Sequence, residues 1–397
     1  MESLVNKCKR KINLCSTKYV RSMMKEIHWN NRLIAIRGAK GVGKTTLMLQ
    51  YLKINGIDYK TQLYVSLDDA YFTQHTLPEF IETFYQRGGK HIFIDEVHKY
   101  QGWSRDIKNI YDDYPDLKVV ISGSSMLNIL NGEADLSRRC IAYEIQGLSF
   151  REYLLMKHKI ELPLVALDEL LANPNATCDA VCAKCRPLAY FDEYLERGYY
   201  PFFTEGEEDY LQRIENVVEY IINQELPQLC GIEVSAIRKL QSLLAVIASN
   251  VPLQVDITKL SSMIETSRNT TVTYLQHLGR ARLLNLLYSD ESSIKRLQKP
   301  DKIYLENPNF MEALSLGGVN QGTRRETFLV GQLKYNHRVE YAKSGDFVID
   351  GKYTIEVGGK SKDGKQIASL DNAFIAADGI EYASGNKIPL WAFGLCY

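Results

Sequence analysis

The sequence predicts an α/β protein that begins with a parallel sheet covered by helices. Five short apolar runs follow one another at the spacing of alternating strands and helices, at residues 33–36, 63–67, 91–94, 117–121 and 141–145. Strands that are buried on both faces of a parallel sheet are continuously apolar in this way. A glycine-rich loop joins the first run to a helix-like stretch, which is the order of a strand–loop–helix unit.

The glycine-rich loop at residues 38–45 has the spacing G-x-x-x-x-G-K-T. Its glycines let backbone N–H groups curl around an anion, and the N-terminus of the following helix adds its dipole. Lys44 is placed to reach the β- and γ-phosphates of a nucleoside triphosphate, and Thr45 to hold Mg²⁺. We therefore expect ATP and Mg²⁺ as cofactors. The predicted nucleotide-binding residues are Gly38, Gly41, Val42, Gly43, Lys44, Thr45 and Thr46.

The third apolar run ends in the acid pair Asp95 and Glu96. Parallel sheets bind ligands at the carboxyl ends of their strands. Asp95 is therefore predicted to hold Mg²⁺ through water, and Glu96 to polarise the attacking water. The alternative is that both acids only solubilise the end of a strand. The phosphate loop, about 50 residues upstream, favours the catalytic interpretation.

Polar side chains beside the fourth and fifth runs are further candidates. Ser122 and Ser124 follow the fourth run, where either could sense the γ-phosphate, although a plain turn explains the same residues. Arg138 and Arg139 precede the fifth run, where one of them could stabilise γ-phosphate charge. A surface ion pair is the alternative for the arginines. We take Glu96, Ser124 and Arg139 as the catalytic candidates.

Composition and charge exclude several classes of protein. The 397 residues contain 48 Lys and Arg against 48 Asp and Glu, so no global field attracts nucleic acid or a membrane. There is no apolar run long enough to span a membrane and no signal-peptide pattern. We expect a cytoplasmic protein in which the eight cysteines are reduced.

Three of the cysteines, Cys178, Cys182 and Cys185, have the spacing C-x-x-x-C-x-x-C. Radical enzymes use this spacing to hold iron–sulfur clusters. The alternative, which we favour, is that positions i, i+4 and i+7 put three easily buried side chains on one helix face. No second cofactor motif lies nearby to support a cluster.

The chain is predicted to contain four domains. Residues 1–146 form the nucleotide-binding domain, and residues 147–234 carry helical patterns, broken by prolines, that we expect to form a lid over the nucleotide. Residues 235–306 are predicted to be a winged helix-turn-helix, and residues 307–397 a small α/β domain. The sequence leaves the oligomeric state open.

The segment at 235–306 reads as three helices followed by two strands, the pattern of a winged helix-turn-helix. It is locally basic, with ten Lys and Arg against six Asp and Glu. In a DNA-reading protein its third helix enters the major groove, with Arg268, Asn269, Thr270 and Thr273 near bases or phosphates. The alternative is a spacer or a protein-contact module.

The last segment resembles the PD-(D/E)xK nucleases in the order of its acids. Glu326 lies in a predicted helix, Asp346 begins a strand-like stretch, and Glu356 lies in the next strand. In those nucleases the acids hold Mg²⁺, and a lysine steadies the attacking water or the scissile phosphate. A three-residue loop at 350–352 places Asp346 directly opposite Glu356.

The lysine departs from that pattern. The expected position, two residues after Glu356, is Gly358, and the first available lysine is Lys360. Lys360 lies about 13 Å along an extended strand. Its long side chain, or a bulge at Gly358 and Gly359, could bring it back to the acids. The departure favours an inactive, structural nuclease-like fold.

Together these motifs resemble the prokaryotic AAA-type ATPases that join a nucleotide-binding domain to a C-terminal domain of unknown function with a restriction-endonuclease-like fold. The resemblance rests on the phosphate loop and on residues 64–69, 94–98, 122–125, 148–153 and 300–305. It implies a P-loop NTPase sheet of order 5-1-4-3-2 and slow ATP hydrolysis used as a switch. Two functions remain open, a switch that docks on a protein or DNA partner and a Mg²⁺-dependent DNA nuclease gated by the ATPase.

Overall fold

In the computed structural model the chain divides into two compact units, Met1–Gln146 and Gly147–Tyr397. The structure describes every residue except 125–135, 137, 290–298 and 316. None of the helices in the described part combines the length and the apolar character needed to cross a membrane.

The first unit is built around a five-stranded sheet in which all neighbouring strands are parallel. Its order is β2-β3-β4-β1-β5, which confirms the predicted order when it is read from the opposite edge. The strands coincide with the five apolar runs, and the three central strands β3, β4 and β1 are almost fully buried. The edge strand β5 has no buried residue, although its run is also apolar. They are β1 (Leu33–Gly38), β2 (Gln62–Ser66), β3 (His91–Asp95), β4 (Lys118–Ser124) and β5 (Ile141–Glu144).

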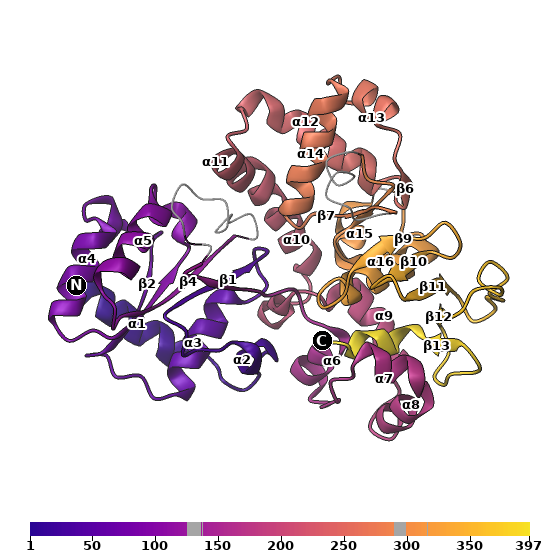
Figure 1. Cartoon of the computed structure of the whole chain (residues 1–397), viewed down its shortest axis with the longest axis horizontal. Coiled ribbons are helices and arrows are strands. Elements are labelled where there is room, and N and C mark those ends of the chain that lie inside the picture. Colours follow the sequence, from indigo (N-terminus) through magenta and orange to yellow (C-terminus); the bar gives the residue numbers. More distant parts are fainter. Residues whose placement is uncertain (125–135, 137, 290–298, 316) are drawn as a thin grey trace. The chain divides into compact units, whose positions relative to one another are not determined.

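Helices cover both faces of this sheet (Figure 1). Helices α1 (Glu2–Leu14) and α3 (Lys44–Ile54) pack together on one face, and α4 (Leu77–Gln86) and α5 (Trp103–Asp113) on the other. The short helix α2 (Met23–Glu26) follows α1. The three-layer arrangement is the expected α/β fold.

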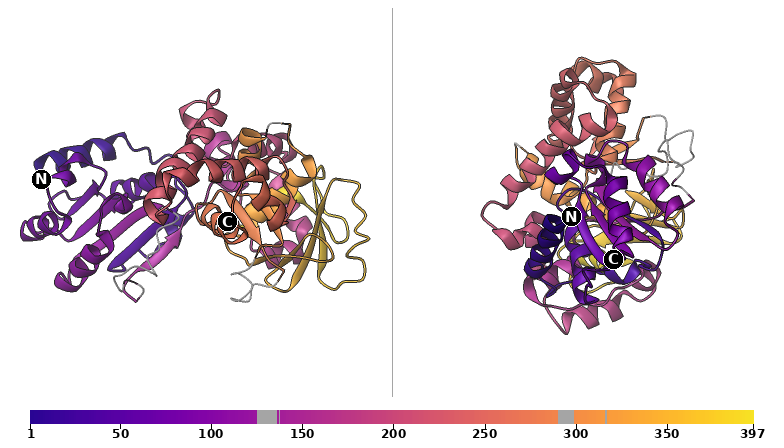
Figure 2. Two further views of the ribbon diagram at one scale, coloured as in Figure 1. Left: turned by 90° about the horizontal axis from the view of Figure 1, so that it is seen from above. Right: turned by 90° about the vertical axis from the view of Figure 1, so that its left-hand side faces the viewer.

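The second unit contains a mixed sheet of order β13-β12-β11-β10-β9, whose orange-to-yellow strands are seen in the left view of Figure 2. Strands β9, β10 and β11 are antiparallel, and β11, β12 and β13 are parallel. Helix α16 (Gln321–Leu333) packs against β11. The strands are β9 (Val339–Tyr341), β10 (Phe347–Ile349), β11 (Tyr353–Gly358), β12 (Ala373–Ala377) and β13 (Lys387–Pro389).

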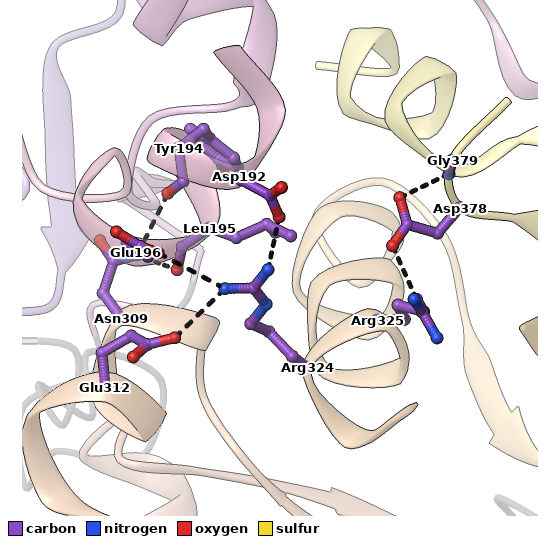
Figure 3. A network of polar contacts seen from close by, with 10 residues as sticks. All are labelled: Asp192, Tyr194, Leu195, Glu196, Asn309, Glu312, Arg324, Arg325, Asp378 and Gly379. Atoms are coloured by element: carbon purple, nitrogen blue, oxygen red, sulfur yellow. Dashed lines mark hydrogen bonds and ion pairs between the residues drawn. The ribbon is translucent and has the colours of Figure 1, made fainter. Parts of the chain in front are cut away.

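A network of polar contacts around the buried Arg324 joins three helices of this unit (Figure 3). Arg324 of α16 donates to Asp192 of α9 (Leu188–Arg197) and to Glu312 of α15 (Pro308–Leu314). The amide of Asn309 donates to the carbonyl oxygen of Leu195 over 2.7 Å. Arg324 is 5% exposed, and a buried guanidinium needs such acceptors to offset the loss of water.

Residues 147–234 belong to the second unit and pack against the C-terminus of the chain. The hydroxyl of Tyr397 donates to the carbonyl oxygen of Gly147 over 3.2 Å. The helices in this part are α6 (Phe150–Tyr153), α7 (Leu167–Ala172), α8 (Pro174–Cys182), α9, α10 (Tyr210–Tyr220) and α11 (Leu226–Cys230). Their use as a lid, and the finer division of this unit into domains, stay predictions.

The three helices and two strands expected at 235–306 are present. Helix α12 (Val234–Ala248) comes first, followed by α13 (Ile257–Met263) and α14 (Arg268–Arg280). Strands β7 (Leu284–Leu287) and β8 (Lys302–Leu305) pair antiparallel. The two-residue strand β6 (Leu253–Gln254) adds a third strand on the other side of β8. Nothing in the periodicity of the sequence indicates β6, because two residues are too short to show alternation.

Candidate functional site

The phosphate loop connects β1 to α3 in a conformation that depends on its glycines. Gly41 and Gly43 have φ angles of 88° and 99°, a region that glycine adopts without steric cost. A Cβ atom on Gly38 would lie 2.3 Å from the carbonyl oxygen of Ile145. Only glycine fits at position 38, where the loop leaves the strand.

The side chain of Lys44 lies inside this loop. Its Nζ atom donates to the carbonyl oxygens of Gly38 and Ala39 over 2.9 and 3.0 Å, and the residue is 7% exposed. Val42 is buried, and its carbonyl oxygen accepts from Arg21 over 3.1 Å. Arg21 therefore braces the loop from outside the motif, a contact that no sequence signal indicated. Thr46 is exposed on the first turn of α3.

Asp95, at the carboxyl end of β3, is surrounded by hydroxyl groups from three neighbouring elements. Thr45 of α3 donates to its Oδ2 atom over 2.7 Å, and Tyr64 of β2 donates to the same atom over 2.6 Å. Ser122 of β4 donates to Oδ1. Asp95 is 3% exposed, so these hydroxyls replace the water that a buried carboxylate loses. The end of the phosphate loop, at Thr45, thus contacts the carboxyl end of β3, at Asp95.

Glu96 follows Asp95 with a φ of 55°, which is uncommon for a residue with a side chain. Its carboxylate is 29% exposed, and Oε2 lies 3.3 Å from Nε2 of His98. Burial lowers the pKa of His98 to about 4, so the imidazole is neutral at pH 7. The backbone N–H of Glu96 donates to Ser122 Oγ over 3.4 Å. The half-buried Glu96 carboxylate therefore lies beside a neutral imidazole.

The remaining candidates of the first unit lie in different surroundings. Ser124 is buried at the end of β4 and pairs in register with Gly38, beside the start of the phosphate loop. Ser125 falls outside the described residues. Arg139 instead faces α5, where its guanidinium donates to both carboxylate oxygens of Asp112 over 2.9 and 3.1 Å. In this conformation Arg139 forms the surface ion pair that was the alternative to a γ-phosphate contact.

In the second unit, β10 and β11 form the expected hairpin. Phe347 pairs with Ile355 and Ile349 with Tyr353, which confirms the three-residue loop at 350–352. This register places Asp346 opposite Glu356. The carboxylate of Asp346 accepts from the N–H of Val357 over 2.7 Å.

Glu326 of α16 lies close to this hairpin. Burial and the negative charge of Glu326 raise the pKa of Asp346, because two nearby carboxylates disfavour each other's charged forms. Lys302 of β8 pairs with Glu326 over 3.0 Å, and the hydroxyl of Tyr304 donates to the same oxygen. The structure therefore places Glu326 near Asp346, which lies opposite Glu356, and adds Lys302, for which the sequence predicted no role at this site.

The lysine beside these acids is Lys362, and Lys360 is exposed. Nζ of Lys362 lies 2.8 Å from Oε1 of Glu356. Strand β11 ends at Gly358, and the turn that follows returns the chain toward the acids. A Cβ atom on Gly358 would lie 2.7 Å from Cβ of Lys362, so the glycine makes room for the lysine stem. Lys362, and not Lys360, therefore contacts Glu356, and a catalytic role for either lysine stays a prediction.

Oε2 of Glu356 is buried and has no hydrogen-bond partner among the residues that the structure describes. Within the same described part, no group of three or more His, Cys, Asp and Glu side chains is arranged to hold a metal ion. Cys178 is buried in α8, but that helix ends at Cys182. Cys185 therefore lies beyond it, and the expectation of one helix face for all three cysteines is wrong.

The residues predicted to meet DNA lie at the start of α14. Arg268, Asn269 and Thr273 are exposed, and Thr270 donates its N–H to the capping hydroxyl of Ser267 over 3.1 Å. A cleft of about 620 Å³ borders this helix and includes Thr270. The first turns of α14 are thus accessible to a partner.

Comparisons with known proteins find similarity over parts of the chain. Residues 30–154 match the family described as an AAA domain, and residues 188–318 match a domain of unknown function. An uncharacterized protein of Methanocaldococcus jannaschii is 25% identical over 91% of this chain and 82% of its own length.

Two solved structures are also similar. The AMPPCP-bound DnaA of Aquifex aeolicus is 16% identical, with a TM-score of 0.29 over 67% of this chain and 92% of that chain. A DNA replication initiation factor is 14% identical, with a TM-score of 0.27 over 70% of this chain and 88% of that chain. At these scores the likeness says nothing about what the chain does. The AAA-domain match, together with the sheet order, supports an AAA-type ATPase in the first unit.

Proposed function

We propose that the chain binds Mg²⁺–ATP, hydrolyses it slowly and uses the nucleotide state as a switch for a partner of its second unit. One observation carries the proposal. The hydroxyl of Thr45 lies 2.7 Å from Oδ2 of Asp95, so the loop that binds phosphate and the acid that attracts a cation converge. An anion cradle beside a cation site is what a metal–nucleotide complex requires.

Each residue of this site has a role in the proposal. The backbone N–H groups of the loop and Lys44 hold the phosphates, and Thr45 and Asp95 hold Mg²⁺, which when bound neutralises charge that develops on the phosphates. Glu96 accepts the proton of the attacking water. Ser124, at the end of the strand beside the loop, orients the water or the γ-phosphate. His98 keeps the Glu96 carboxylate in place.

The hydrolysis step is tested by the release of phosphate from ATP. The purified chain is expected to release phosphate slowly with Mg²⁺ and not with EDTA. Equal rates with and without Mg²⁺, or no release above the Glu96→Gln variant, would contradict the proposal. The partner is tested by co-purification with the Glu96→Gln variant, which holds ATP without hydrolysing it.

The segment from α12 to β8 supports DNA as one partner. The order helix, strand, two helices and two strands is that of a winged helix-turn-helix, and Arg268 is exposed at the start of α14. Arg268→Ala is expected to weaken binding of duplex DNA. It should also lower, by about one, the slope of the logarithm of the binding constant against the logarithm of the salt concentration. The matched control is Lys184→Ala. Lys184 is an exposed lysine whose Nζ atom donates to the backbone carbonyl oxygen of Glu161. Equal binding by parent and Arg268→Ala would favour a protein partner.

A second candidate function is Mg²⁺-dependent cleavage of DNA. It is favoured by the charge of Glu326 near Asp346, by the register that places Asp346 opposite Glu356, and by the buried Oε2 atom of Glu356, which has no hydrogen-bond partner among the described residues. Asp346 and Glu356 would hold the Mg²⁺ ion, and Lys362 would steady the attacking water. Cleavage that requires Mg²⁺ and is lost in Glu356→Gln and Lys362→Ala, but kept in Lys360→Ala, would establish this function. DNA that stays intact under these conditions would exclude it.

A further inference from the structure

The side chain of Tyr64 connects the N-terminal helix to the predicted magnesium site. It is 2% exposed, and its hydroxyl donates to Oδ2 of Asp95 over 2.6 Å. The same oxygen accepts from Thr45 over 2.7 Å. Tyr64 and Thr45 therefore donate to the same carboxylate oxygen of Asp95, and both Thr45 and Asp95 are predicted to hold Mg²⁺.

Helix α1 contacts Tyr64 at both ends of the residue. The thiol of Cys8 accepts the backbone N–H of Tyr64 over 3.4 Å. Nζ of Lys11 donates to the Tyr64 hydroxyl oxygen over 3.3 Å and lies 4.9 Å from the centre of its ring. Lys7 pairs with Asp69, just after β2, over 2.6 Å. Lys7, Cys8 and Lys11 share one face of the helix, because residues three and four apart lie on the same side of it.

The donors and acceptors in this chain of contacts fix the direction of the tyrosine hydroxyl. An ammonium group can only donate, so the Tyr64 oxygen accepts from Lys11. Its own hydrogen is then directed to Asp95. Successive hydrogen bonds of this kind polarise one another in a buried site.

We propose that Tyr64 is a positioning residue for Asp95 in the magnesium site and that α1 sets its orientation through Lys11. The inference rests on the proposed binding of Mg²⁺–nucleotide. Once the Thr45 hydroxyl turns to the ion, Tyr64 and Ser122 remain to hold the Asp95 carboxylate. Helix α1 precedes residues 30–154, which match the AAA domain. Through Lys11 and Tyr64 it thereby helps to position a ligand of the nucleotide-bound Mg²⁺.

The test compares nucleotide affinity with and without the metal ion. A fluorescent ADP analogue is titrated into the full chain, once with Mg²⁺ and once with EDTA, and the ratio of the two dissociation constants gives the gain from Mg²⁺. Tyr64→Phe is expected to reduce this gain by about tenfold, the usual effect of removing an outer partner of a metal ligand. Its affinity in EDTA should equal that of the parent. The matched control is Tyr51→Phe, because Tyr51 stacks on Trp29 and is absent from the Asp95 contacts.

A double-mutant cycle then tests the route through Lys11. Lys11→Met is expected to reduce the gain from Mg²⁺ in the parent and to have no further effect in Tyr64→Phe. Lys9→Met is the control, since Lys9 lies on the same helix over the ring of Tyr59. Thermal unfolding of each variant identifies any loss of folding.

The outcomes separate this inference from the proposed function. If the parent gains affinity from Mg²⁺ and Tyr64→Phe shows the same gain, the role of Tyr64 is overturned, while the proposed function is unaffected. Equal losses in Mg²⁺ and in EDTA would show a structural role only. Additive effects of Lys11→Met and Tyr64→Phe would overturn the route through α1. A parent that binds no nucleotide would overturn the proposed function as well.

Discussion

The ammonium group of Lys362 lies 2.8 Å from Oε1 of Glu356, a residue that is 1% exposed. The other oxygen of that carboxylate has no hydrogen-bond partner within the described residues. The positive charge of Lys362 therefore compensates the negative charge of the buried Glu356 carboxylate. The pair joins the end of β11 to the turn that follows it.

Removal of Lys362 should destabilise the second unit. Lys362→Met leaves the buried Glu356 carboxylate without its cation, and we expect the free energy of unfolding to fall by about 1–3 kcal/mol. The side chain of Lys362 is 32% exposed, so water screens part of the interaction. Urea denaturation of the full chain measures the change. Lys360→Met is the matched control and should change stability by less than about 0.5 kcal/mol; an equal loss in both variants would contradict the assignment.

Acid should destabilise the first unit through His91. Burial lowers the pKa of His91 from 6.5 to about 4, and its Nε2 atom has no partner among the described residues. The unfolded chain therefore binds the proton more readily, and stability falls as the pH drops below 6.5. For these pKa values the loss at pH 5 is about 2 kcal/mol.

His91→Leu removes this titration. Relative to the parent, the variant should gain about 2 kcal/mol on going from pH 7 to pH 5, measured by urea denaturation at both values. A constant difference between parent and variant would show that His91 does not titrate on unfolding.

Glu96→Gln separates binding from hydrolysis. Glutamine keeps the shape and the hydrogen bonding of the side chain but cannot accept the proton of the attacking water. Turnover should drop about 100-fold or more, the scale of a general base, while ATP affinity stays at the parent value. Unchanged turnover would move the catalytic role to another acid, with Asp68 and Asp69 the next to test.

The parallel sheet and the phosphate loop could be predicted because their signals are local. Each buried strand carries its own apolar run, and the loop requires glycine at fixed positions. The hairpin register at 350–352 was also predictable, since alternation along two strands fixes which residues face each other.

The rest depends on contacts between distant parts of the chain. Nothing local distinguishes Lys362 from Lys360, because the turn after Gly358 decides which lysine returns to the acids. No local pattern predicts a role for Tyr64 or Lys302, and their contacts with Asp95 and Glu326 arise only when the strands and helices pack. The cysteine pattern misled for a related reason, because helix α8 ends before Cys185.

The central claim is that the first unit binds ATP through its phosphate loop, and titration of a fluorescent ATP analogue into the Lys44→Ala variant tests it most directly. Lys44 supplies the positive charge that the motif places at the β- and γ-phosphates, and alanine removes it. We predict binding by the parent chain and by Lys53→Ala, a control on the same helix whose lysine donates to the carbonyl oxygen of Cys15. We predict no measurable binding by Lys44→Ala. Parent-like affinity in Lys44→Ala would contradict the account.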